Sequence, residues 1–336
     1  MKKIIELFFL CCAMANSITV LAQQSDLRFR SDKKFKIVQF TDIHWVPGNP
    51  ASEDAYACMN AVLDAEKPDL VVYTGDLVYG KPAAEALQRC LKPVVDRKIP
   101  FAVTWGNHDD EQDLNRQALF DEIKDLPGNC TARTEGLTGI TNYILPLKSS
   151  AGNTTSFLLY VFDSNAYTQL PNAKGYAGIQ PDQVQWYIEK SKAYTTAHGG
   201  TPYPAMAFFH IPFPEYNEAA QNENTSLTGT RKERACSSSL NYGLFASMLQ
   251  CGDVMATFVG HDHINDYAAN WKNMLLCYGR FTGGDTVYCN IPGGNGARVI
   301  ELTEGVRSFT TWIRLHDGKV IHRINYPEDY APYKSK

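Results

Sequence analysis

The sequence predicts an α/β fold whose strands pair mainly in parallel. Short apolar runs typical of buried strands alternate along the chain with longer segments in which apolar residues recur at helical spacing. Several of the apolar runs end in polar loops that begin with glycine. Strands separated by helices pair in parallel through right-handed crossovers, and 336 residues with 44% hydrophobic residues suffice for a large core.

Each expected element follows from one of these patterns. Strands, with the loops that follow them, are expected over residues 35–42, 69–76, 99–110, 204–216 and 255–263, and a hairpin over 141–147 and 155–165. Helices are expected over residues 53–67, 81–97, 110–126, 180–195 and 244–253. Residues 217–239 are polar and predict a long surface loop, and residues 279–326 predict strands joined by Gly-rich turns. No repeat or linker divides the chain, so we expect one domain over residues 23–336.

The N-terminus has the pattern of a secretory signal peptide over residues 1–22. Lys2 and Lys3 precede an apolar stretch, and small residues precede Gln23. An uncleaved membrane anchor and a lipoprotein, lipidated at Cys11 or Cys12, are the alternatives. Polar residues interrupt the apolar stretch and a bulky leucine precedes the two cysteines, so we expect export to the periplasm or the outside of the cell.

The net charge and the cysteines further limit the possible classes of function. A net charge of −4 without a dense basic run argues against a nucleic-acid-binding surface. No segment after the signal peptide is apolar enough to span a bilayer. Seven cysteines remain after the signal peptide, none in a C-x-x-C pattern, and the sequence is equally consistent with two or three disulfides and with buried thiols. The oligomeric state stays open.

Every expected core strand in the series is followed by potential metal ligands. They are Asp42 and His44, then Asp76, then Asn107, His108 and Asp109, then His210, and finally His261 and His263. A His-x-His pair in a loop is more often two solvated side chains than a metal site, and each of the other pieces also has an ordinary structural interpretation. If the five strands share a sheet, however, their ends open on one edge and the ligands converge there.

These residue types favour a centre of two metal ions. Asp and Asn oxygens together with neutral imidazoles suit Mn, Fe or Zn. Two cations about 3.5–4 Å apart need an anion between them, so one carboxylate is expected to bridge. No cysteine is placed at a strand end, which argues against a thiolate zinc site.

The stretches FTDIHW, YTGDLVYG, TWGNHDDE, FFHIP and FVGHDHIND resemble the five signature motifs of calcineurin-like metallophosphoesterases. Phrases such as AEKPDLVVYTGD and FVGHDHINDY are similar to the purple acid phosphatase-related subgroup. The resemblance covers residues 35–326 and implies a four-layer α/β/β/α sandwich with two central mixed sheets.

The resemblance also implies a ligand set. Metal one would be held by Asp42, His44, Asp76 and His263, and metal two by Asp76, Asn107, His210 and His261, with Asp76 bridging. Purple acid phosphatases take a tyrosine ligand from a Gly-Asp-x-x-Tyr motif and have glycine where this chain has His44. Since this chain also has Tyr79 in that motif, we expect His44 to be the ligand and Tyr79 to lie beside it, without the purple iron–tyrosinate colour.

The function expected from this site is hydrolysis of phosphate monoesters by an exported enzyme. A hydroxide shared by the two metals would attack phosphorus, and His108 would protonate the leaving group as general acid, with Asp109 or Asp42 orienting its ring. Arg280 and Arg298 could steady the substrate phosphate, although a structural role is the more frequent one.

Two other functions fit the same residues. The first alternative is a phosphodiesterase or nucleotide pyrophosphohydrolase, which a wider groove beside residues 217–239 would favour. The second is a catalytically silent metal-binding protein.

Overall fold

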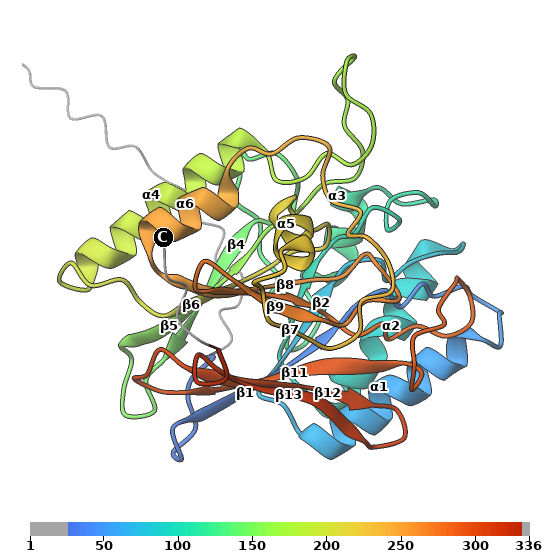
Figure 1. Cartoon of the computed structure of the whole chain (residues 1–336). Helices are drawn as coiled ribbons and strands as arrows, with labels where there is room; N and C mark the ends of the chain where they lie inside the picture. Colours follow the sequence, from blue (N-terminus) through green and yellow to red (C-terminus); the bar gives the residue numbers. More distant parts are fainter. Residues whose placement is uncertain (1–25, 331–336) are drawn as a thin grey trace, which may run out of the picture.

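Two β-sheets lie face to face at the centre of the molecule (Figure 1). The computed structural model describes residues 26–330, and the expected signal peptide at residues 1–22 lies outside them. The first sheet has the order β13 (Val320–Tyr326), β12 (Phe309–Leu315), β11 (Gly296–Thr303), β1 (Lys34–Phe40), β2 (Leu70–Thr74), β3 (Phe101–Thr104). The second has the order β4 (Tyr143–Lys148), β5 (Thr155–Val161), β6 (Ala205–Phe208), β8 (Val254–Val259), β10 (Met274–Tyr278), β9 (Ala268–Trp271), β7 (Leu227–Thr228).

Both sheets are mixed. In the first, β1, β2 and β3 are parallel, while β11, β12 and β13 add antiparallel strands. In the second, β5, β6, β8 and β10 are parallel, and β4, β9 and β7 extend the edges antiparallel. The central parallel strands are continuous apolar runs, as in β2, where every residue is buried, because helices or the other sheet cover both faces.

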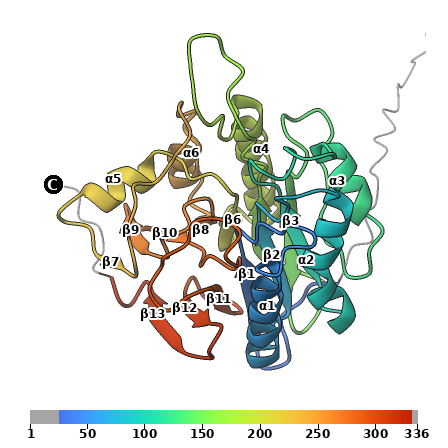
Figure 2. The same cartoon turned by 90° about the vertical axis from the view of Figure 1, so that its right-hand side faces the viewer.

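Helices cover the outer faces of the sheets. On the first sheet lie α1 (Ser52–Glu66) and α2 (Ala83–Arg97), which run side by side in Figure 2, and on the second lie α4 (Pro181–Ala197) and α6 (Leu244–Cys251). Three hydrophobic clusters fill the spaces between these layers, one between the sheets and one under each helical layer. The expected four-layer α/β/β/α sandwich is therefore confirmed.

Local signals explain where two of the helices begin. α2 begins directly after Pro82, and α4 begins with Pro181, whose missing N–H group costs nothing at that position. The side chains of Gln180 and Gln183 form a capping box around the first turn of α4. Both helices match the sequence-based expectation within two residues.

Two expected elements differ. The helix expected over residues 110–126 is only α3 (Arg116–Ile123), because acidic side chains before it bond to other segments; Asp113, for example, accepts the backbone N–H of Ala83. The loop expected over residues 217–239 contains the end of α5 (Glu215–Gln221) and the short strand β7.

Two further expectations concern membranes and disulfides. Within residues 26–330, no helix combines the length and apolar composition needed to cross a bilayer. No disulfide joins any two of the seven cysteines in this part of the chain.

Candidate metal centre

The predicted ligands converge at the ends of five strands, but these strands belong to two sheets. Asp42 and His44 follow β1, Asp76 follows β2 and Asn107 follows β3, all in the first sheet. His210 follows β6, and His261 and His263 follow β8, in the second sheet. The five strands therefore do not share one sheet, contrary to the condition assumed from the sequence. The ligands meet because the two sheets are stacked with these strand ends at the same end.

Backbone conformation turns four of these side chains toward one another. Asp42, His44, Asp76 and His261 have φ values of 55°, 49°, 54° and 81°, in the left-handed region that residues other than glycine seldom adopt. Such conformations cost free energy and cluster at functional sites, where the surrounding structure holds them in place.

Two glycines let the strand ends approach closely. A Cβ at Gly106 would collide with Oδ1 of Asp76, and a Cβ at Gly260 would collide with Thr41 and lie 2.7 Å from Oδ2 of Asp42. The glycines before Asn107 and His261 are therefore required by the contact between backbones and ligand carboxylates.

Asp42, His44 and His263 form the first group of ligands. All three are buried, and each offers a ligand atom within 4.8 Å of the others. The Nε2 atoms of His44 and His263 lie 3.0 Å apart, and Oδ1 of Asp42 lies 3.8 Å from Nε2 of His263. Thr41 and the backbone N–H of His261 donate to the Asp42 carboxylate and fix it.

Asp76, His210 and His261 form the second group, and Asn107 lies against it. Nε2 of His210 lies 3.1 Å from Oδ2 of Asp76, 3.3 Å from Nδ1 of His261 and 3.2 Å from Oδ1 of Asn107. Four potential ligand atoms, from the residues that follow β2, β3, β6 and β8, thus face one small space.

Asp76 lies between the two groups. Its Oδ1 accepts the backbone N–H of His108 at 2.8 Å. Its Oδ2 is buried and accepts no hydrogen bond within the described residues, but lies 3.1 Å from the ring nitrogen of His210 and 3.7 Å from that of His44. A buried carboxylate oxygen left in this way calls for a positive charge beside it.

The protonation of the histidines suits cation binding. Burial lowers the pKa of His263 to about 4 and holds the pKa values of His44 and His261 well below their usual range, so these rings are neutral. Burial alone would raise the pKa of Asp76, but His210 and His44 hold it well below its usual range. Burial would lower the pKa of His210, yet Asp76 raises it to about 9, and a bound cation would replace that proton as the partner of Asp76.

Hydrogen bonds on the far side of two rings complete the arrangement. Nδ1 of His210 donates to the carbonyl oxygen of Thr74 at 2.8 Å, and Nδ1 of His263 donates to that of Tyr288 at 2.9 Å. Both rings therefore direct Nε2 into the site, which is how metal-ligating histidines are oriented. The donor set and its orientation fit two metal ions.

His108 lies beside the ligand groups and differs from the prediction in its partner. Its Nδ1 lies 2.6 Å from Oε2 of Glu111. Neither Asp109 nor Asp42 contacts the ring. Asp109 is buried and accepts the backbone N–H groups of four residues, Gly106, Asp76, Leu77 and Val78. The expected orienting role of Asp109 is wrong in this respect: it fixes the two loops that carry Asp76 and Asn107.

Tyr79 lies where the sequence predicted, beside the ligands. Its ring meets the His44 ring edge-on at 5.0 Å and the His108 ring at 5.3 Å between centroids. Its half-buried ring therefore limits the movement of both imidazoles.

Three supporting residues were missed from the sequence. Asp262 accepts hydrogen bonds from the Tyr278 hydroxyl at 2.6 Å and from the backbone N–H of Cys236, and so fixes the loop after β8 that carries His261 and His263. Arg116 donates to the carbonyl oxygen of Gly106. Nε2 of Gln39 donates to Thr74 in its own sheet and to the carbonyl oxygen of Val259 in the other. Arg116 and Gln39 lie outside the quoted motifs, and no local pattern signals them. Asp262 lies inside FVGHDHIND between the two predicted histidine ligands, so its position in that motif could have indicated it.

Arg280 and Arg298 have structural roles. Both are fully buried. Arg280 forms an ion pair with Asp266, and Arg298 donates to the carbonyl oxygens of Tyr278 and Asp266. Neither guanidinium is free to hold a substrate phosphate.

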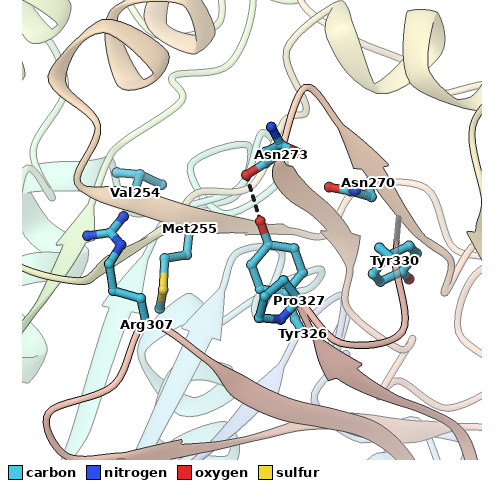
Figure 3. A pocket seen from close by; sticks show the side chains of 8 residues that line it. All are labelled: Val254, Met255, Asn270, Asn273, Arg307, Tyr326, Pro327 and Tyr330. Atoms are coloured by element: carbon cyan, nitrogen blue, oxygen red, sulfur yellow. Dashed lines mark hydrogen bonds between the residues drawn. The ribbon is translucent and has the colours of Figure 1, made fainter. Parts of the chain in front are cut away.

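A separate cavity of about 260 Å³ lies far from the ligand groups (Figure 3). It is lined by the first residues of β8, Val254 and Met255, whereas His261 follows the last. The Tyr326 hydroxyl donates to the carbonyl oxygen of Asn273 across its wall. This cavity lies at the opposite end of β8 and takes no part in the metal centre.

The fold and the two ligand groups are typical of the dinuclear metallophosphoesterase family. The family model described as calcineurin-like phosphoesterase matches residues 35–265, and the chain belongs to this family. The structure of a dimetal phosphatase from Danio rerio shares the fold, with a TM-score of 0.58 and 14% identity, over 87% of this chain and 98% of that one.

Two relatives indicate the subgroup of the family to which the chain is similar. It is 32% identical to a protein of Arabidopsis thaliana named probable inactive purple acid phosphatase 29, over 92% of this chain and 89% of the relative. It is 31% identical to phosphatase DCR2 of Saccharomyces cerevisiae, over 86% of this chain and 55% of that protein. The resemblance to purple acid phosphatase-related proteins is confirmed.

Proposed function

We propose that the protein is an exported, metal-dependent phosphomonoesterase. The observation that carries the proposal is the position of the Asp76 carboxylate, which faces His210 of one buried ligand group and His44 of the other. The proposed ligands are Asp42, His44, Asp76 and His263 for one ion and Asp76, Asn107, His210 and His261 for the other. Their nitrogen and oxygen donors suit Fe, Mn or Zn.

Two such ions, when bound, would activate water and neutralise charge on the phosphoryl oxygens. The residues of the chain have separate tasks. Asp76 and Asp42 supply the negative charge that holds the centre together. His108, held beside the ligands by its backbone bond to Asp76, donates a proton to the leaving oxygen. Asp109 keeps the loops of Asp76 and Asn107 at a fixed spacing.

A monoester is favoured over a diester by how residues 230–236 pack. Oε1 of Glu233 accepts the backbone N–H of Ile264 at 2.9 Å, and the Tyr288 hydroxyl donates to Oε2 at 3.2 Å. This segment therefore closes against the loops of the metal centre. The second ester group of a diester substrate would need an open groove between residues 230–236 and the loops of the metal centre.

Export is part of the proposal because residues 1–22 have the charge, apolar stretch and small residues of a cleavable signal peptide. Mass spectrometry of the N-terminus after expression with the leader would test it, with a mature chain that begins near Gln23 as the expected result. An intact leader would contradict export with cleavage.

Catalysis is tested by measuring turnover on protein of known metal content. We expect hydrolysis of phenyl phosphate and of an alkyl phosphate, with slower hydrolysis of bis(nitrophenyl) phosphate and of a nucleoside diphosphate. Preference for the last two would establish the diesterase or pyrophosphohydrolase alternative. Full metal content without any turnover would establish the silent metal-binding alternative, with which the word inactive in the name of the Arabidopsis relative agrees.

A further inference from the structure

We propose that Glu111 and Tyr167 form a positioning pair for His108; the proposal rests on the function proposed above. Oε2 of Glu111 lies 2.6 Å from Nδ1 of His108, and the Tyr167 hydroxyl donates to Oε1 of Glu111 at 3.1 Å. Both oxygens of one carboxylate are thus engaged, one by the ring beside the metal centre and one by a tyrosine from a distant loop.

The local backbone brings Glu111 to the ring. The N–H of Glu111 donates to the carbonyl oxygen of His108 at 3.2 Å, which closes a turn and places the two side chains on the same side. The other acids of this stretch are engaged elsewhere, Asp109 by four backbone N–H groups and Asp110 by Arg116. Glu111 is therefore the acid of this stretch that can orient the ring.

The bond from Nδ1 determines which nitrogen can act on the substrate. Because Nδ1–H donates to Glu111, Nε2 is the nitrogen left to face the leaving group. When the bond between phosphorus and the leaving oxygen breaks, its electron pair goes to that oxygen, which takes the proton from Nε2. The imidazole is then neutral and still bonded to Glu111 through Nδ1–H.

Tyr167 also links this pair to His261 of the second ligand group. Its ring stacks on that of Tyr176 at 5.5 Å, and Tyr176 meets the His261 ring edge-on at 4.4 Å. Both tyrosines belong to the segment between β5 and α4, which projects beyond the sandwich in both views (Figures 1 and 2) and is closed by a backbone bond from Thr168 to Gly175. The position of this segment therefore sets the position of the Glu111 carboxylate.

The kinetic test compares two leaving groups in four variants: Glu111→Ala, Tyr167→Phe, His108→Ala and the double variant His108→Ala/Glu111→Ala. An alkoxide needs a proton to leave and a nitrophenolate does not. We expect Glu111→Ala to lose roughly 10–100-fold in kcat/KM on an alkyl phosphate and only several-fold on nitrophenyl phosphate. Its metal content should equal that of the wild type. Tyr167→Phe should show a smaller loss of the same kind. In the His108→Ala background, Glu111→Ala should cost nothing further.

The exposed Glu122→Ala is the matched control and should leave both substrates unaffected. Equal losses of Glu111→Ala on the two substrates, additive losses in the double variant, or loss of metal would each overturn the proposal.

A spectroscopic test does not depend on turnover. Long-range ¹H–¹⁵N spectra of the zinc-loaded protein, with His108 assigned by His108→Ala, should show the proton on Nδ1 in the wild type and its loss from Nδ1 in Glu111→Ala. Identical His108 signals in both proteins would overturn the proposal. An inactive wild type with the expected shift would remove the phosphatase function and leave the Glu111–His108 contact in place.

Discussion

The Nε2 atoms of His44 and His263 lie 3.0 Å apart although 219 residues separate them in the sequence. His44 follows a strand of the first sheet and His263 a strand of the second, so the stacking of the sheets creates the contact. Asp76 stands in a similar relation to His210, and the four predictions below on the site and the one on stability follow from such contacts.

Replacement of Asp76 by Asn should weaken both metal sites. The substitution keeps the shape of the side chain but removes the negative charge that faces both ligand groups. We expect fewer than two equivalents of metal after dialysis, as counted by elemental analysis. Asp253→Asn, which alters an equally buried carboxylate at the far end of β8, is the control and should retain its metal. Two equivalents held by Asp76→Asn at wild-type affinity would remove the bridging assignment.

His108→Ala should keep its metals and lose activity according to the leaving group. A general acid is worth roughly 10²–10⁴-fold when the leaving group needs a proton. The loss in kcat/KM should therefore be large on an alkyl phosphate and small on nitrophenyl phosphate. The exposed His198→Ala serves as control. Equal losses on both substrates would exclude the acid role, and a parallel loss of metal would make His108 a ligand.

The iron-loaded protein should lack an intense visible charge-transfer band. In the proposed ligand set His44, and not Tyr79, binds the metal, and Tyr79 packs against His44 edge-on. Absorption spectra of the iron-loaded wild type and of Tyr79→Phe should therefore agree in the visible region. A purple colour that disappears in Tyr79→Phe would show that Tyr79 binds the metal.

Gly260→Ala should disturb Asp42. The added methyl group would collide with Thr41 and approach the Asp42 carboxylate, so the strand ends must move apart. We expect a cost of about 1–3 kcal/mol in unfolding free energy, as for an overpacked core, together with weaker metal binding. Gly152→Ala, where a Cβ meets nothing within 4 Å, should change neither quantity.

Glu66 should make stability depend on pH in acid. Burial would raise its pKa, but hydrogen bonds from Trp312, Arg314 and Lys36 hold the pKa below its ordinary value of 4.5. The native state therefore takes up this proton at lower pH than the unfolded state. The stabilisation is complete above about pH 4.5 and is lost as the pH falls through the lower native value.

Urea unfolding of Glu66→Gln measures this contribution. At neutral pH the variant should be less stable by roughly 1.5–3 kcal/mol, the worth of a hydrogen bond to a charged group. The difference in unfolding free energy between Glu66→Gln and the wild type should narrow as the pH falls below about 4.5. The exposed Glu122→Gln should have the same unfolding free energy as the wild type at each pH. A difference that does not change with pH would exclude the ionised carboxylate as its source.

The ligands could be predicted from the sequence because each follows an apolar strand directly, and a strand end is a local feature. Which strands share a sheet could not, since β1 pairs with β11, some 260 residues later, and no local pattern records that pairing. The partner of His108 was missed for a related reason. Three acids follow it in a row, and the turn that buries Asp109 and exposes Glu111 depends on four backbone N–H groups from two loops.

The distribution of the ligands over the two sheets has a consequence for the stability of the whole molecule. Each ion would be held by residues of both sheets, so neither half of the sandwich could retain one alone. Bound metal would therefore stabilise the two sheets in their stacked arrangement, by a free energy that rises with the logarithm of the metal concentration once this exceeds the dissociation constant. A chelator would weaken the packing of the two sheets against each other. Any substitution that weakens this packing, however far from the ligands, would be detected as a loss of affinity for metal.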